Sequence, residues 1–248
     1  MLNRRGVLLS ALCLAGSGAR VATLPAPPRT QTLAKQLAIE PDGISWVPVT
    51  SRTIFLTFDD GPDPDHTEFV LDILDDFEAS ATFFMIGRNV DRYPNLAREV
   101  SARGHVIGNH SQDHIWLDRR SRSTVEAQVG TGERTISKAG LPESRLFRVP
   151  HGWTSPTVRD TVRDLGLRST FWTDCVEARL YHADPPLAAQ QVAAAARPGT
   201  VILAHDGGRL DGPNPQHMDR RRTMETLPLL LHNLADRGFR FASLPVHA

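Results

Sequence analysis

The chain has 248 residues, of which 40% are hydrophobic and 23% are charged, and its formal net charge is zero. This composition is ordinary for a globular protein with one large domain and argues against a disordered or membrane-embedded chain. A neutral chain also lacks the excess of basic residues that is typical of nucleic-acid binding, so we expect no nucleic-acid partner.

The first residues have the pattern of a targeting segment. Arg4 and Arg5 precede a mostly apolar run over residues 6–15, and small residues follow at 17–19. The order of these residues resembles a twin-arginine signal, so we predict a signal peptide over residues 1–19 and an exported protein. The apolar run is too short to span a bilayer, and we expect no stable membrane insertion once it is removed.

The next segment is rich in proline and threonine, which predicts a tether over residues 20–50 and a catalytic domain over residues 51–246. Short apolar runs then alternate with longer amphipathic stretches, as in repeated βα units. The expected strands cover residues 53–58, 82–86, 105–108, 146–149, 169–172, 201–204 and 240–244. The expected helices cover residues 67–77, 96–102, 123–139, 156–165, 187–196 and 223–236.

This alternation predicts an α/β fold, a distorted (β/α) barrel of seven to eight strands. In such a barrel the functional site lies where the strands end, at their C-terminal side. Polar side chains follow the predicted strands at those points: Asp59, Asp60, His110, Arg148, Asp174 and His205. We therefore expect these side chains to converge on one rim.

Two histidines and an acidic pair suggest a metal site. The spacing of His110 and His114 would place both imidazoles on one face of a helical turn. Asp59 and Asp60 leave a buried strand together, and two adjacent carboxylates are costly to ionise there without a cation. By itself the acidic pair also fits a simple turn. A zincin site is excluded because Ser111, and not a glutamate, follows the first histidine.

Four segments in order resemble the motifs of polysaccharide deacetylases, carbohydrate esterase family four, which share the NodB-homology domain. They are TFDDGP at 57–62, HSQDH at 110–114, FRVPHG at 147–152 and VILAHDGG at 201–208. The resemblance covers residues 52–244.

The resemblance implies that Asp60, His110 and His114 bind one divalent metal, with zinc expected and cobalt, manganese or nickel as alternatives. It implies that Asp59 is the general base that activates the attacking water, and that Arg148 holds Asp59.

The resemblance further implies that His205 is the general acid, with Asp174 as its orienting partner. The backbone N–H of His151 would hold the oxyanion, although the family usually has Tyr there. Leu203 would line the acetyl pocket. Trp153 and Trp116 stand close to motif residues, and their aromatic faces fit either stacking on sugar rings or buried packing. The segment after Asp174 departs from the family's Asp-x-x-Asp-Trp pattern because it lacks the tryptophan.

The function implied is metal-dependent removal of N-acetyl groups from a polysaccharide that contains N-acetylglucosamine, peptidoglycan or chitooligosaccharide, with release of acetate. Two alternatives stay open. One is an O-deacetylase of acetylated xylan, or another amide or ester hydrolase on the same barrel, and the other is a non-catalytic carbohydrate-binding descendant. The run of arginines at 220–222 is interpreted as a solvated part of a rim loop.

Overall fold

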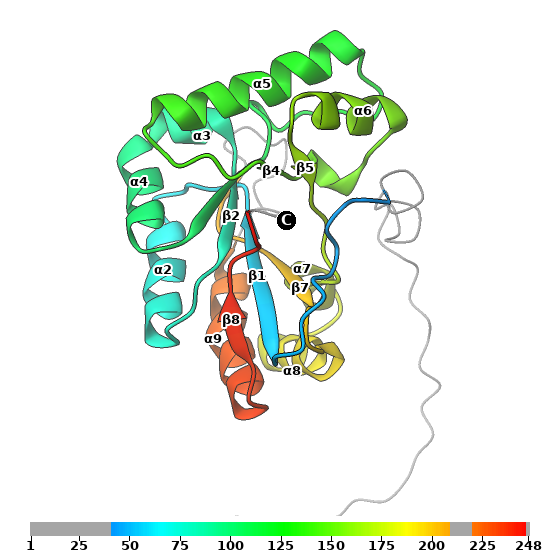
Figure 1. The fold of residues 1–248 in the computed structure, drawn as a ribbon. Helices are drawn as coiled ribbons and strands as arrows, with labels where there is room; N and C mark the ends of the chain where they lie inside the picture. The colour runs from blue at the N-terminus through cyan, green and yellow to red at the C-terminus, as the bar shows by residue number, and fades with distance from the viewer. Residues whose placement is uncertain (1–40, 209–219, 247–248) are drawn as a thin grey trace, which may run out of the picture.

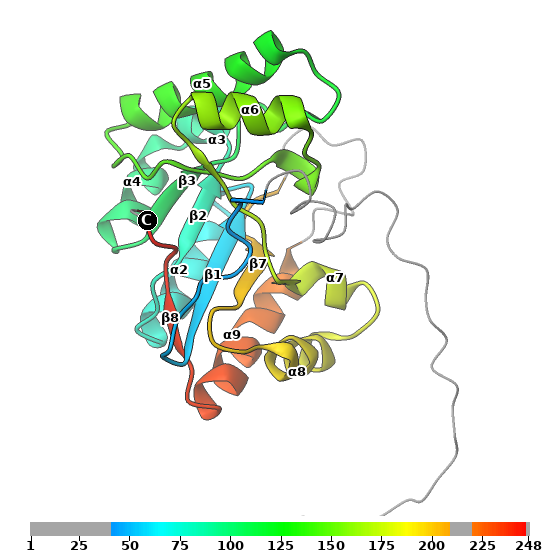
Figure 2. The same cartoon turned by 45° about the vertical axis from the view of Figure 1, so that its right-hand side comes forward.

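A computed structural model describes residues 41–208 and 220–246 of the chain. A curled parallel sheet lies at the centre, and the helices surround its outer side (Figures 1 and 2). The strands are β1 (Thr53–Asp59), β2 (Thr82–Met85), β3 (Val106–Asn109), β4 (Leu146–Phe147), β5 (Arg168–Ser169), β6 (Asp174–Cys175), β7 (Val201–His205) and β8 (Arg240–Ala242). The helices are α2 (Thr67–Asp76), α3 (Gly87–Arg92), α4 (Pro94–Ala102), α5 (Arg122–Lys138), α6 (Pro156–Asp164), α7 (Val176–Leu180), α8 (Pro185–Ala195) and α9 (Arg221–Asp236), with a 3₁₀ turn η1 (Pro150–Gly152).

The sheet order confirms the predicted α/β barrel. The strands run β5-β4-β3-β2-β1-β7-β6, and β8 pairs with the first half of β1. Every recorded strand pairing is parallel, so the C-terminal ends of the strands open on the same side of the molecule. The seven predicted strands and six predicted helices are all present, and β6, α3 and α7 are additional. These three elements are too short to give a periodic signal.

Alternation along β1 decides which side chains reach the site. Ile54 and Phe58 point outward and belong to the large core that packs against the helices. Phe55 points inward and belongs to a separate apolar cluster that includes Val201 of β7 and Leu244. Because side chains alternate along a strand, Thr57 and Asp59 share the inner face with Phe55. The inner apolar cluster therefore closes the start of the barrel, and polar side chains occupy its far end.

The residues just before β1 belong to the folded domain. Ile44 and Val47 are buried in the inner apolar cluster. The Ile44 N–H donates to Ser169 O over 2.9 Å, and the Val47 N–H donates to Gly199 O over 3.0 Å. This segment therefore connects the β5 side of the sheet to the β7 side.

The predicted tether and the predicted domain start at Ser51 are thus wrong for residues 44–47, which are packed. A packed segment of four residues is too short to show a pattern in the sequence. Residues 1–40, with the predicted signal peptide and most of the tether, lie outside the described residues, so those predictions stay predictions. Across the described ranges no helix has both the length and the apolarity needed to cross a bilayer.

Candidate metal and catalytic site

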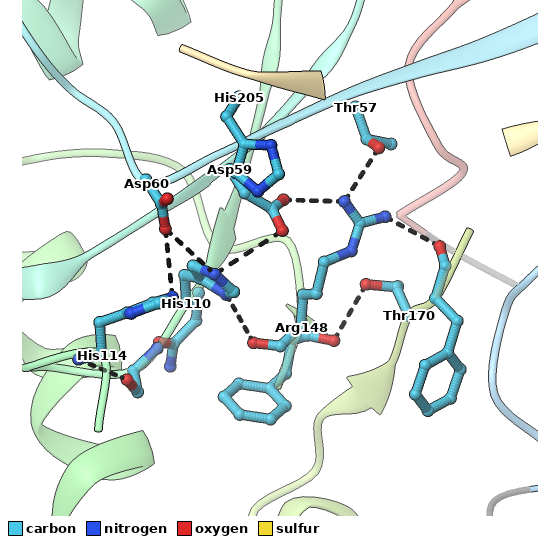
Figure 3. A network of polar contacts seen from close by, with 12 residues as sticks. Thr57, Asp59, Asp60, His110, His114, Arg148, Thr170 and His205 are labelled. Carbon is cyan, nitrogen blue, oxygen red and sulfur yellow. Dashed lines mark hydrogen bonds and ion pairs between the residues drawn. The ribbon is translucent and has the colours of Figure 1, made fainter. Parts of the chain in front are cut away.

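Three buried side chains form a cluster with the spacing of a metal site. His114 Nε2 lies 3.1 Å from Asp60 Oδ1, and His110 Nε2 lies 3.5 Å from the same oxygen. Figure 3 shows both imidazoles turned toward Asp60. One ligand atom from each of the three residues lies within 4.8 Å of the others, so the structure brings the predicted metal ligands together.

The hydrogen bonds around this cluster suit a cation. His110 Nδ1 lies 2.8 Å from the carbonyl oxygen of Arg148, so this nitrogen carries the proton and Nε2 presents its lone pair to Asp60. Asp60 Oδ1 is buried and accepts no hydrogen bond from the described residues. Two imidazoles and one carboxylate that meet in this way fit a divalent metal ion.

The spacing of the two histidines predicted a helical turn, but the structure has none there. Residues 110–114 form a loop in which Ser111 and His114 have φ values of 65° and 55°. Left-handed conformations of such residues cost about 1–3 kcal/mol each, and side-chain bonds offset the cost here. The Ser111 N–H donates to Asn109 Oδ1 over 2.7 Å, and the His114 N–H donates to Ser111 Oγ over 3.1 Å.

Asp59 lies beside the cluster and is held by Arg148. The guanidinium donates to Asp59 Oδ1 over 2.8 Å, to Thr57 Oγ1 over 2.9 Å and to Phe171 O over 2.9 Å (Figure 3). Arg148 is fully buried, and its guanidinium lies 4.1 Å from the ring centroid of Phe84. The other carboxylate oxygen, Asp59 Oδ2, lies 3.6 Å from His110 Nε2. Arg148 thus fixes one oxygen of Asp59 and aims the other at the cluster.

His205 ends β7 in register with Asp59 and pairs with Glu177. His205 Nδ1 lies 3.0 Å from Glu177 Oε2, and the His205 N–H donates to Glu177 Oε1 over 3.1 Å. Burial acts to lower the pKa of His205, but the Glu177 carboxylate outweighs it and the pKa is raised. Burial acts to raise the pKa of Glu177, while the charge of His205 lowers it, to about 2 overall. The pair therefore favours a protonated imidazole and an ionised carboxylate.

Asp174 is not the partner of His205, which corrects the sequence prediction. Arg179 donates to Asp174 Oδ2 over 2.8 Å and to Oδ1 over 3.1 Å, and the Cys175 N–H donates to Oδ1 over 2.8 Å. β6 runs directly into α7, and the first helical turn brings Glu177 to the histidine. The signal in the sequence was the second acidic residue, three positions after Asp174.

Arg220 also reaches the cluster, although the sequence suggested a solvated charge run. Its Nη2 lies 3.1 Å from Asp60 Oδ2, and its Nε donates to Gly207 O over 2.9 Å. Arg220 is 7% exposed and stands directly before α9. The guanidinium therefore occupies the oxygen of Asp60 that faces away from the histidines. Residues 209–219 of the predicted rim loop lie outside the described residues.

The turns after β1 and β7 are packed on each other. A Cβ atom at Gly207 would overlap the main chain of Asp60, and one at Gly61 would overlap the Asp206 carboxylate. Burial raises the pKa of Asp206 to about 7, and Thr67 Oγ1 donates to its Oδ2 over 2.7 Å. The two glycines therefore permit the close approach that brings the two motif turns together.

Comparison with known proteins identifies the family. The family model for polysaccharide deacetylases matches residues 47–170, which is 124 of the 248 residues. A peptidoglycan-N-acetylglucosamine deacetylase from Bacillus cereus is 35% identical over 210 residues, which covers 83% of this chain and 93% of that protein. The chain belongs to the polysaccharide deacetylase family.

Other members of the family are similar over most of their length. A chitooligosaccharide deacetylase from Azorhizobium caulinodans is 36% identical over 198 residues, covering 78% of this chain and 93% of that protein. The structure of a family 4 acetyl xylan esterase from Clostridium thermocellum, in complex with a cobalt ion, matches with a TM-score of 0.64 at 30% identity. That match covers 77% of this chain and 87% of the esterase chain.

Of the residues predicted to contact substrate, His151 lies against the cluster of this deacetylase. His151 has a φ of 61°, and its ring lies 4.4 Å from that of His114 and 3.9 Å from that of Trp116. Trp153 shares a surface pocket with Trp116. Leu203 is buried on the inner face of β7, level with Thr57. The roles assigned to the His151 N–H, to Trp153 and to Leu203 stay predictions.

Proposed function

We propose that this deacetylase removes N-acetyl groups from N-acetylglucosamine units of peptidoglycan or chitooligosaccharide, releases acetate and uses zinc. The observation that carries the proposal is the placement of a held carboxylate and a paired imidazole next to one metal-binding cluster. Asp59 and His205 end adjacent parallel strands in register, and Asp60 with its two histidines lies beside them. The names of the relatives support the same substrate classes.

Each side chain has a role that follows from its contacts. A bound divalent ion supplies Lewis acidity, lowering the pKa of water and polarising the acetyl carbonyl. Asp59 Oδ2 faces the cluster and receives the proton of the attacking water, while Arg148 prevents the carboxylate from turning away. His205 is held protonated by Glu177 and gives its proton to the leaving amine.

The proposal is tested by measuring acetate release from N-acetylglucosamine oligomers, peptidoglycan and acetylated xylan, with and without a chelator. We expect activity on the first two substrates, loss on chelation with recovery on addition of zinc, and a loss of at least a hundredfold in Asp59→Asn, as for removal of a general base. Asp65→Asn is the matched control, because Asp65 is exposed in the same loop. Activity that survives both chelation and Asp59→Asn would contradict the mechanism.

One alternative substrate has a specific observation in its favour. The similarity to an acetyl xylan esterase supports O-deacetylation, and an ester leaving group demands less of the general acid than an amine does. Faster acetate release from acetylated xylan than from the N-acetylated oligomers, with little loss in His205→Gln, would favour that activity. A non-catalytic carbohydrate-binding protein would release acetate from none of the three.

The proposed substrates place this deacetylase outside the cytoplasm, and the segment over residues 1–19 is the proposed export signal. Replacement of both Arg4 and Arg5 by Lys should block export of a folded reporter fused to this segment. Continued export would contradict the twin-arginine route.

A further inference from the structure

A pocket of about 330 Å³ lies on the surface and is lined by Trp116, Asp118, Arg119, Arg120 and Trp153. A column of aromatic rings connects it to the metal cluster. The rings of His110 and His114 lie 4.8 Å apart, those of His114 and His151 lie 4.4 Å apart, and those of His151 and Trp116 lie 3.9 Å apart. One ring, that of His151, therefore separates the pocket wall at Trp116 from His114 of the cluster.

The indole side chains suit a sugar ring. Trp116 is stacked on His151 with 11° between the ring planes, so His151 covers one face of the indole and fixes its orientation. It still leaves 38% of its surface exposed, and Trp153 forms another part of the wall. Aromatic faces pack on the apolar face of a pyranose, and the volume lies at the lower end for ligand pockets. One sugar unit fits this description better than a longer segment does.

The charges around the pocket suit an anion. Arg119 is paired with Asp118 at 3.5 Å, and its side chain is 92% exposed. Arg120 donates from Nε to Trp116 O over 3.2 Å, and no acidic side chain among the described residues forms a salt bridge with it. Two arginines against one aspartate leave one positive charge at the pocket.

We propose that this pocket is a subsite for the sugar next to the reacting N-acetylglucosamine unit, and that it favours a neighbour carrying a carboxylate. Peptidoglycan strands have such a neighbour where the stem peptide has been removed, because N-acetylglucosamine then alternates with a sugar whose lactyl carboxylate is free. Chitin oligomers are neutral. The inference rests on the proposed function and narrows its substrate to the peptidoglycan type.

The test compares kcat and KM of the zinc-loaded protein on two tetrasaccharides. One consists of N-acetylglucosamine alone, and in the other N-acetylglucosamine alternates with N-acetylmuramic acid. The double variant Arg119→Gln/Arg120→Gln should raise KM for the acidic tetramer about fivefold more than KM for the neutral tetramer, as expected for exposed charge pairs. A loss common to both tetramers would reflect the bond that Arg120 Nε donates to Trp116 O. Arg134→Gln, an exposed arginine on α5, is the matched control.

The aromatic wall has its own variants. Trp116→Ala should raise KM for both tetramers by about tenfold without changing kcat, and Trp116→Phe should restore most of the loss. Equal effects of the double arginine variant on both tetramers, or none, would overturn the preference for an acidic neighbour. An unchanged KM in Trp116→Ala, or a loss confined to kcat and zinc affinity, would overturn the subsite.

A binding measurement separates this inference from the proposed function. Calorimetric titration of both tetramers into His205→Gln does not depend on turnover. Tighter binding of the acidic tetramer that is lost in the arginine double variant would support the subsite even if the wild type released no acetate. Equal affinities for the two tetramers would overturn it even if the wild type were active on both.

Discussion

The pairing of His205 with Glu177 leads to the sharpest prediction, because the sequence had suggested Asp174 instead. Glu177→Gln removes the negative charge 3.0 Å from His205 Nδ1 and keeps the size of the side chain. Both side chains are about one-fifth exposed, so solvent screens the pair only in part. A hydrogen bond to a charged group contributes about 1.5–3 kcal/mol, which corresponds to a fall in kcat/KM of roughly ten- to a hundredfold.

The pH dependence gives a second readout with a defined sign. The carboxylate raises the pKa of His205, so in the wild type the acid form persists until the pH rises past that raised value. Without the Glu177 carboxylate, burial is the dominant influence on His205, and it lowers the pKa of the imidazole. The basic limb of the pH profile of kcat/KM should therefore move to lower pH in Glu177→Gln.

Asp174→Asn is the matched control, because Asp174 contacts Arg179 and not His205. It should keep the wild-type pH profile and most of the activity. Glu177 also accepts a hydrogen bond from Thr223 Oγ1, so the thermal unfolding of each variant should be recorded alongside its activity. An unchanged basic limb in Glu177→Gln, combined with a shifted limb in Asp174→Asn, would refute the assignment.

Three further variants test the structure around the site. Arg148→Met leaves its buried polar partners without a hydrogen-bond donor and should lower the free energy of unfolding by about 3–5 kcal/mol in urea titrations. Arg145→Met removes an exposed ion pair and should change the free energy of unfolding little. Arg220→Gln should weaken zinc binding about tenfold by calorimetry, because the guanidinium orients the metal-binding carboxylate; tighter binding would show that charge repulsion dominates instead. Ile44→Ala should lower the free energy of unfolding by about 2–5 kcal/mol because Ile44 is buried in the inner apolar cluster. A loss no larger than that caused by Leu165→Ala, at an exposed position, would mean that this segment is not packed.

The fold was predictable because its repeated units are long enough to show their period. Apolar positions on α2, with Val70, Leu71 and Leu74 on one face, are visible in the sequence and are buried in the structure. The two-residue strand β6 and the five-residue helix α7 carry no such pattern, and Glu177 lies on that unpredicted helix. The wrong partner for His205 therefore follows from an element that the periodicity could not resolve.

Residues whose role depends on long-range burial were the other misses. Nothing local separates Arg220 from the two arginines that follow it, since only the approach of α9 to the Asp60 turn buries it. The same holds for Ile44, whose hydrogen-bond partner Ser169 is more than a hundred residues away in the chain. By contrast, the clustering of Asp60, His110 and His114 could be predicted, because motif residue types stood at or just beyond the ends of strong strands.

The end of β1 also explains how two adjacent aspartates serve one cluster. Side chains alternate along a strand, so a continued β1 would turn Asp60 away from the face that carries Asp59. Asp60 instead has a φ of 79°, a left-handed conformation that aspartate tolerates better than most residues. The alternation is broken there, and His110 Nε2 lies 3.6 Å from Asp59 Oδ2 and 3.5 Å from Asp60 Oδ1. The proposed proton acceptor and the proposed metal ligand are therefore separated by one backbone step, whose geometry the packed turn at Gly207 maintains.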